Sequence, residues 1–191
     1  MQSSYDGPPR RKSGVHWAWI VLGILAICGC GGVGLLGSIL FPAFSRARAI
    51  AQERRCISNV RVLVAASAMY AEDFDDHLPP ASLWMDALKS RADSPGNFSC
   101  PSVSRPNAFG PRVAGKYGYA FNEALSGKSR KGFSAQKSEV LIFESLDVSR
   151  NAQGDPATSA PPNRHGKGRT QGFTDGHAAF VKSSSSPSGS E

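Results

Sequence analysis

The chain has 191 residues, a formal net charge of +7 and a pI near 9.5. This length suits one ordinary domain with attachments, and the positive charge is compatible with anionic lipid, polysaccharide or nucleic acid as a partner. The basic residues are scattered and form no patch interleaved with aromatic residues, which argues against a dedicated nucleic-acid-binding domain.

An uncharged apolar run follows the N-terminus. Residues 1–14 are polar, basic and rich in proline and glycine, so we predict that they are disordered. Residues 17–41 contain no charged side chain, and about 20 apolar residues suffice for a helix to cross the hydrocarbon core. We therefore predict a transmembrane helix over residues 15–41, with membrane lipid as a partner. A secretory signal peptide is the alternative, although its apolar region is usually only about 7–15 residues long.

The helical pattern continues past the apolar run with a different periodicity. Apolar side chains recur at helical spacing at Ile50, Ile57, Val60, Val64, Ala71 and Phe74. Such spacing predicts an amphipathic helix that packs one face on a domain. Pro42 removes one backbone hydrogen bond, which a membrane helix tolerates. We expect one long helix, first in lipid and then amphipathic, that ends before Pro79 and Pro80.

The rest of the chain predicts a small sheet. Residues 82–91 indicate a short helix capped by Ser82, residues 115–125 and 138–147 indicate strands, and residues 151–163 form a turn-rich loop. Two short strands within 169–182 flank Asp175-Gly176, a dipeptide typical of tight hairpin turns. The expected fold class is α+β, with the long helix packed on a mostly antiparallel sheet. The head covers residues 42–182, and residues 183–191 form a disordered tail.

An ordered set of motifs resembles a known family. The motifs are ILFPAFSRARAIAQERRC, SNVRVLVAASAMYAEDFDDHLPP, a tryptophan, FSCPS, YGYAFN and RHG…FTDGH. Together they look like the bacterial type II secretion pseudopilins and prepilin-like proteins, in the branch with a C-terminal His…Asp-Gly box. The resemblance implies a membrane-embedded N-terminal helix, a head outside the inner membrane, pseudopilin-like or secretion-system subunits as partners, and no enzymatic activity.

The N-terminus departs from that family at its processing signal. Prepilins carry a glutamate shortly after a glycine cleavage site, but Trp19 stands where Gly14 would place that glutamate. We therefore predict that prepilin peptidase does not cleave after Gly14.

Two cysteines belong to the predicted head. Cys28 and Cys30 fall within the apolar run, which leaves Cys56 and Cys100. One pair fits a single disulfide in an oxidising compartment, and two unrelated free thiols are the alternative. The bond would enclose about 43 residues and contribute roughly 4 kcal/mol in the loop-entropy model.

The box His165, Asp175 and His177 is a candidate metal site, because imidazole and carboxylate bind first-row divalent ions. The alternative is a sheet terminus, in which Asp175 and Gly176 supply the turn and His177 begins the last strand. We favour the sheet terminus and predict no cofactor, while a divalent cation stays open.

Four carboxylates within residues 72–77 oppose the helix dipole. Calcium would offset them, and nearby arginine or lysine is the simpler alternative. No catalytic motif accompanies these clusters, so we expect a non-enzymatic anchored protein. The rivals are an anchored metal-dependent hydrolase built on the box, and an anchored module that binds polysaccharide or DNA.

Overall fold

The computed structural model describes residues 14–104, 113–132, 138–166 and 168–183, without the side chains of residues 14, 15, 26–37 and 39. The chain divides into two compact units, Met1–Ala47 and Arg48–Glu191. The segments that we predict to be disordered, 1–14 and 183–191, lie almost entirely outside the described residues.

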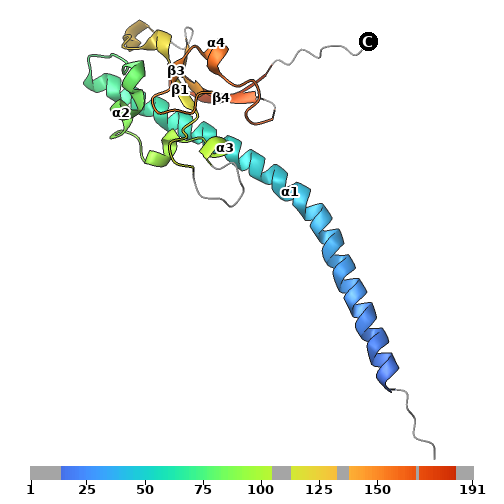
Figure 1. The fold of residues 1–191 in the computed structure, drawn as a ribbon. Coiled ribbons are helices and arrows are strands. Elements are labelled where there is room, and N and C mark those ends of the chain that lie inside the picture. The colour runs from blue at the N-terminus through green and yellow to red at the C-terminus, as the bar shows by residue number, and fades with distance from the viewer. Residues whose placement is uncertain (1–13, 105–112, 133–137, 167, 184–191) are drawn as a thin grey trace, which may run out of the picture. The chain divides into compact units, whose positions relative to one another are not determined.

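One helix, α1, runs from Gly14 to Asp73 and includes Pro42 (Figure 1). This confirms the prediction that the helix continues past the apolar run. Among the described residues, no helix offers an apolar stretch long enough to cross a membrane. The predicted span, residues 17–41, contains residues 26–37, whose side chains lie outside the described part, and it stays a prediction.

The end of α1 is set by two residues in the left-handed region. Asp75 and Asp76 have φ angles of 50° and 65°. The Asp76 amide donates to the Ala71 carbonyl over 2.7 Å, which satisfies one carbonyl of the last turn. Pro79 and Pro80 follow, as the sequence predicts, and the chain turns back toward the sheet.

A five-stranded sheet forms the other layer of the head. Its strands are β1 Tyr119–Asn122, β2 Val140–Glu144, β3 Gln153–Gly154, β4 Gly168–Phe173 and β5 Ala178–Lys182. The spatial order is β3-β1-β2-β4-β5, in which β1 and β3 are parallel and the other neighbours antiparallel. The α+β class is confirmed, and the sheet is mixed. The predicted hairpin is also confirmed, because β4 and β5 pair across the turn that holds Gly176 at φ +99°.

Short helices connect these elements. They are η1 Ala81–Leu83, α2 Trp84–Leu88, η2 Pro95–Phe98, α3 Pro101–Ser104, η3 Glu123–Leu125, η4 Arg130–Gly132 and α4 Pro156–Ser159. The predicted cap at Ser82 is wrong, because Ser82 lies inside η1 and no side chain caps α2. The predicted loop 151–163 contains β3 and α4, which are too short to show a periodic pattern.

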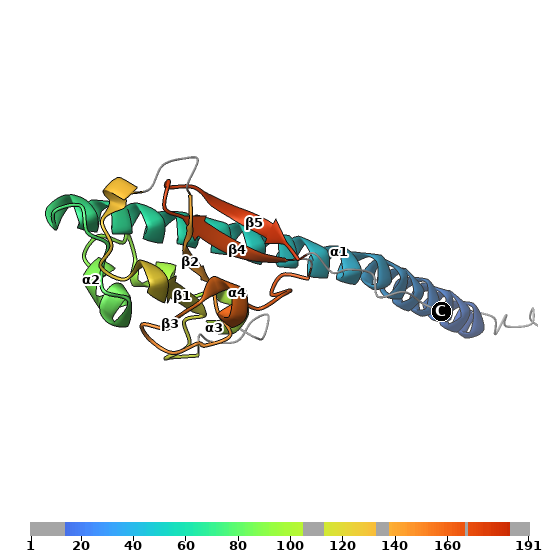
Figure 2. The ribbon, with the colours of Figure 1, turned by 90° about the horizontal axis from the view of Figure 1, so that it is seen from above.

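The main core lies between the sheet and the part of α1 that begins at Arg48. Figure 2 shows β4 and β5 alongside this part of the helix. Val60, Leu63 and Val64 of α1 are buried against Phe121 of β1 and Ile142 of β2. Burial of this apolar surface stabilises the head by about 25 cal/mol per Å².

The opposite face of the sheet has a smaller core. Ala120 and Phe143 pack there with Ala152 and Ala160, residues of the segment that contains β3 and α4. Neighbouring residues of β1 therefore point to opposite sides, as strand geometry requires. Both faces of the central strands are covered, which explains why the apolar run of β2 is continuous rather than alternating.

Candidate metal centre

Four side chains from separate parts of the head meet in its interior. One ligand atom each from Cys56, Cys100, Glu144 and His165 lie within 4.8 Å of one another. Among the described residues, these four form the only group of His, Cys, Asp and Glu that could hold a metal ion. We call them the cysteine–histidine centre.

Each residue of the centre is placed by a different element. Cys56 lies on the buried face of α1, and Glu144 is the last residue of β2. Cys100 immediately precedes α3, where its amide donates to the Tyr117 carbonyl over 2.7 Å. His165 lies in the turn before β4, next to Gly166, whose φ of +80° suits glycine.

The distances within the centre join all four residues. Glu144 Oε1 lies 2.6 Å from His165 Nε2 and 3.5 Å from Cys100 Sγ. Cys100 Sγ lies 2.9 Å from Cys56 Sγ. The side chains of Glu144 and His165 are 0% and 3% exposed, and both cysteines are 0% exposed. The centre is therefore closed to solvent.

Two further hydrogen bonds orient the charged pair. The Thr170 amide donates to Glu144 Oε2 over 2.8 Å, so that Oε1 is the oxygen that faces the sulfurs. Ser102 Oγ lies 3.4 Å from His165 Nδ1, so that Nε2 is the nitrogen that faces them. Thr170 and Ser102 thus contact the sides of the Glu144 carboxylate and the His165 imidazole that face away from the sulfurs.

The protonation of His165 follows from its neighbours. Burial by itself lowers the pKa of His165, but hydrogen bonds with Cys100 and Glu144, together with their negative charges, raise the pKa to about 9. Near neutral pH the imidazole is protonated and offsets the buried carboxylate. This charge balance removes part of the cost of burying Glu144.

The two thiols behave as one coupled pair. The hydrogen bond from Cys56 lowers the pKa of Cys100 to about 6 against the effect of burial, and His165 assists. The hydrogen bond with Cys100 and burial raise the pKa of Cys56 far above its usual range. The pair therefore gives up its first proton readily and holds its second.

Both cysteines are free in the structure, although their sulfurs are in contact. The structure brings together the two residues that the sequence pairs, and the disulfide itself stays a prediction. A disulfide and a metal ion held by both thiolates exclude each other, because they use the same two sulfurs.

The structure does not bring His165, Asp175 and His177 together. Asp175 Oδ1 lies 2.5 Å from His177 Nδ1, and His177 stacks on Phe173 at a ring separation of 4.2 Å. These residues lie beyond the end of β4, whereas His165 precedes its start. Six strand residues at about 3.3 Å each separate the two ends by about 20 Å. Asp175 and His177 thus close the hairpin, which agrees with a sheet terminus.

The acidic segment 72–77 is met by basic side chains. Asp73 pairs with Arg91 at 2.5 Å, and Asp76 pairs with Arg130 and Lys131 at 3.6 and 3.9 Å. These ion pairs offset the negative charge at the end of the helix. They agree with the alternative to calcium, in which nearby arginine or lysine meets the carboxylates.

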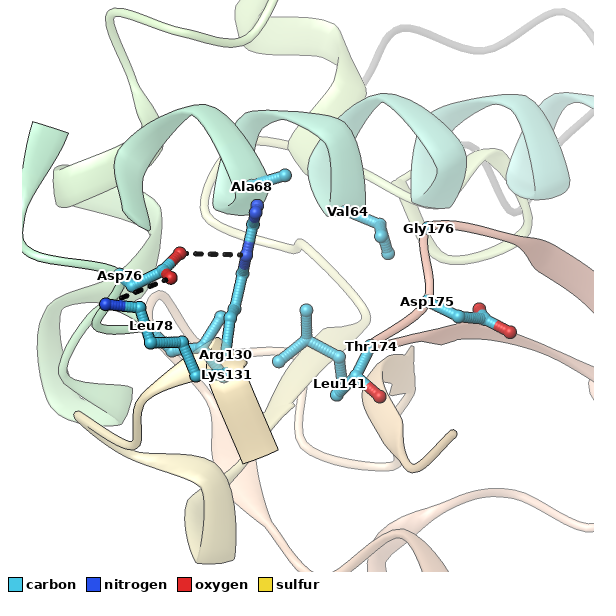
Figure 3. A pocket seen from close by; sticks show the side chains of 10 residues that line it. All are labelled: Val64, Ala68, Asp76, Leu78, Arg130, Lys131, Leu141, Thr174, Asp175 and Gly176. Atoms are coloured by element: carbon cyan, nitrogen blue, oxygen red, sulfur yellow. Dashed lines mark ion pairs between the residues drawn. The ribbon is translucent and has the colours of Figure 1, made fainter. Parts of the chain in front are cut away.

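A pocket of about 380 Å³ lies beside these pairs (Figure 3). Asp76, Arg130 and Asp175 are among its lining residues, and the Asp175 carboxylate points away from Arg130. Since His165 and His177 do not line this pocket, the box supplies no convergent set of catalytic groups here.

Glu144 is the residue of the candidate centre that sequence reasoning missed. It closes the apolar run of β2, and a fully buried glutamate requires a partner. An acidic residue inside a predicted buried strand was the available signal, but its partners come from three other segments that the sequence does not place.

Searches of family models, curated proteins and solved structures return no match for this chain.

Proposed function

We propose that this chain is a membrane-anchored, non-enzymatic protein of the bacterial envelope, with a pilin-like head that works through assembly or binding. Its place is the inner membrane, crossed once, with the head in the periplasm or at the cell exterior. A link to type II secretion rests on the sequence resemblance alone.

The observation that carries the proposal is the apolar surface of the first unit. Most of its described large apolar side chains are exposed; within the predicted span they include Trp17, Trp19, Ile20, Leu22, Ile24, Leu25, Leu40 and Phe41. Their exposed fractions reach 79% at Phe41. A helix that is apolar on all sides needs a non-aqueous environment, and lipid or the helices of neighbouring subunits would supply it. The absence of any charge in residues 17–41 supports lipid.

Two features of the head support binding rather than catalysis. The cysteine–histidine centre is closed, whereas a catalytic centre needs an open position for its substrate. The three residues on which a hydrolase would depend lie at opposite ends of β4. The anchored hydrolase is therefore the weaker reading.

Membrane fractionation tests the anchor. The full chain should remain in the membrane pellet after washes with high salt and with carbonate, and should leave it only with detergent. The double variant Leu22→Arg with Leu25→Arg should shift to the soluble or aggregated fraction, because an arginine inside a span costs up to about 2.5–3.5 kcal/mol, the value at its centre.

The control is Phe44→Arg with Ile50→Arg, which replaces exposed apolar residues of α1 beyond the predicted span. This variant should stay in the pellet. Release of the unmodified chain by carbonate alone would refute the anchor. Protease added to spheroplasts should digest the head if it lies outside the inner membrane, and protection of the head would reverse the proposed topology.

A further inference from the structure

We infer that Cys56, Cys100, Glu144 and His165 bind one Zn²⁺ ion, which holds the layers of the head together. The site is distinct from the box that the sequence suggests, and only His165 belongs to both. The inference does not depend on the proposed membrane anchor.

The chemistry of the donors favours zinc. Two sulfurs, one imidazole nitrogen and one carboxylate oxygen make four donors, the number that zinc takes in structural sites. Thiolate and imidazole suit a borderline-soft ion, whereas calcium and magnesium prefer a shell of oxygen atoms. The set of donors therefore argues against calcium or magnesium at this centre.

The separations between donors fit a tetrahedral ion after a small expansion. Zinc–ligand distances of about 2.0–2.3 Å place neighbouring donors about 3.3–3.8 Å apart. Glu144 Oε1 and Cys100 Sγ are 3.5 Å apart, which lies within that range. The Cys56–Cys100 and Glu144–His165 pairs, at 2.9 and 2.6 Å, would each open by about 1 Å or less. Such a shift is within reach of side-chain torsions.

Hydrogen bonds on the far side of Glu144 and His165 determine which atom of each side chain is directed at the metal site. Thr170 occupies Glu144 Oε2, and Ser102 lies at His165 Nδ1. Metal-bound histidine and carboxylate groups usually have such partners, which fix the tautomer and the orientation of the ligand. Glu144 Oε1 and His165 Nε2 are thus directed at the sulfurs.

A disulfide by itself does not account for this arrangement. A disulfide is neutral and needs neither a carboxylate nor an imidazole beside it, yet Glu144 and His165 are both buried in contact with the cysteines. Burying two ionisable groups is costly unless a partner compensates for the loss of hydration. A cation bound by all four side chains would offset the negative charges of the carboxylate and the two thiolates, and His165 and the thiols would release their protons to solvent on binding.

The four ligands also explain what the ion would do. They come from α1, the segment before α3, the end of β2 and the turn before β4, so the ion would connect the long helix to one strand and two connecting segments. The side chains of all four ligands are buried, as is typical of structural zinc rather than catalytic zinc.

The test uses the full chain in mild detergent, reduced with a phosphine and stripped with a chelator. Titration with Co²⁺ should reach one ion per chain and produce intense visible bands of tetrahedral cobalt, with a thiolate-to-cobalt charge-transfer band in the near ultraviolet. Zn²⁺ should displace the cobalt and abolish these bands, and elemental analysis should then find one zinc per chain.

Four variants and one control locate the site. Cys56→Ser, Cys100→Ser, Glu144→Gln and His165→Gln should each lower the affinity for Zn²⁺ at least about 100-fold, since loss of a ligand exceeds the 10- to 100-fold effect of an outer-shell partner. The control is His177→Gln, which removes the exposed histidine of the hairpin and should bind zinc like the unmodified chain.

Two results would overturn the inference. The first is a reduced, folded chain that takes up no Co²⁺ or shows no charge-transfer band. The second is zinc affinity that is unchanged in Glu144→Gln and His165→Gln but lost in His177→Gln. Far-ultraviolet circular dichroism distinguishes unfolding from loss of binding, and the spectrum of the unmodified chain does not depend on any variant folding.

Discussion

His165 Nε2 and Glu144 Oε1 form an ion pair of 2.6 Å inside the head, with both side chains almost fully buried. Among the partners of Glu144 in the described part of the chain, only His165 supplies a positive charge, because the Thr170 amide is neutral and Cys100 is never positively charged. The stability of the metal-free head should therefore depend strongly on this histidine.

His165→Leu should lower the free energy of unfolding of the reduced, metal-free chain by about 3–5 kcal/mol, because it leaves a buried carboxylate without its counter-charge. Urea titration of the full chain in detergent measures the change. His177→Leu is the matched control. Its ring is 52% exposed, so the change there should stay within about 0.5 kcal/mol. Equal losses in the two variants would show that the buried pair is not special.

Cys56 and Cys100 should label differently before and after reduction if they form a disulfide in the envelope. Mass spectrometry of the full chain, taken from membranes and alkylated with and without reductant, reads this directly. Cys56→Ser, Cys100→Ser and the double variant should then lose the same stability, up to roughly 4 kcal/mol, because each opens the same loop. Full labelling without reductant would exclude the bond.

Gly172 allows β4 to pack closely on α1. A Cβ at this position would lie 2.5 Å from Val64 and 2.6 Å from Val60, two buried and branched side chains that cannot easily move aside. Gly172→Ala should therefore destabilise the head by about 1–3 kcal/mol in urea titration. Gly132→Ala, where the space around a Cβ is open, should change stability by less than about 0.5 kcal/mol.

Asp86 makes the stability of the head depend on pH in the acid range. Hydrogen bonds from Arg150 and then Asn151 lower the pKa of Asp86 to about 2, below the value of about 3.9 for an unfolded chain. Because the folded-state pKa is the lower one, the contribution is complete above pH about 4 and is lost as the pH falls toward 2.

The difference in melting temperature between the unmodified chain and Asp86→Asn should accordingly shrink between pH about 4 and 2. Both side chains of the ion pair are almost half exposed, so the effect is small. Arg150→Gln should give the same pH dependence, since it removes the other partner. A difference that stays constant down to pH 2 would contradict the assignment.

The sequence predicts those elements whose pattern either repeats over many turns or is contained in a few adjacent residues. The helix through residues 42–73 repeats its apolar positions over many turns, and Asp175-Gly176 specifies a turn by its own backbone preference. By contrast, β3 has two residues and α3 has four, so neither displays a period. The conformation of β3, for example, depends on its neighbour β1, where the Phe121 amide donates a hydrogen bond to the Ala152 carbonyl.

The candidate site is predictable only in part for a related reason. The sequence singles out Cys56, Cys100 and His165, but it groups His165 with its neighbours in the box. The residues between His165 and Asp175 form strand β4, so the two side chains lie at opposite ends of that strand. Glu144 joins the centre through strand pairing between β2 and β4, a contact that no local pattern encodes.

The order in which the chain is synthesised determines when the centre can form. Cys56 leaves the ribosome well before His165, by roughly 5–20 s at about 5–20 residues per second. During that interval the Cys56 thiol is not yet enclosed by the other three side chains. It can be oxidised or can react with a thiol of another molecule. Only when β2 and the turn before β4 have docked do the four side chains enclose one another.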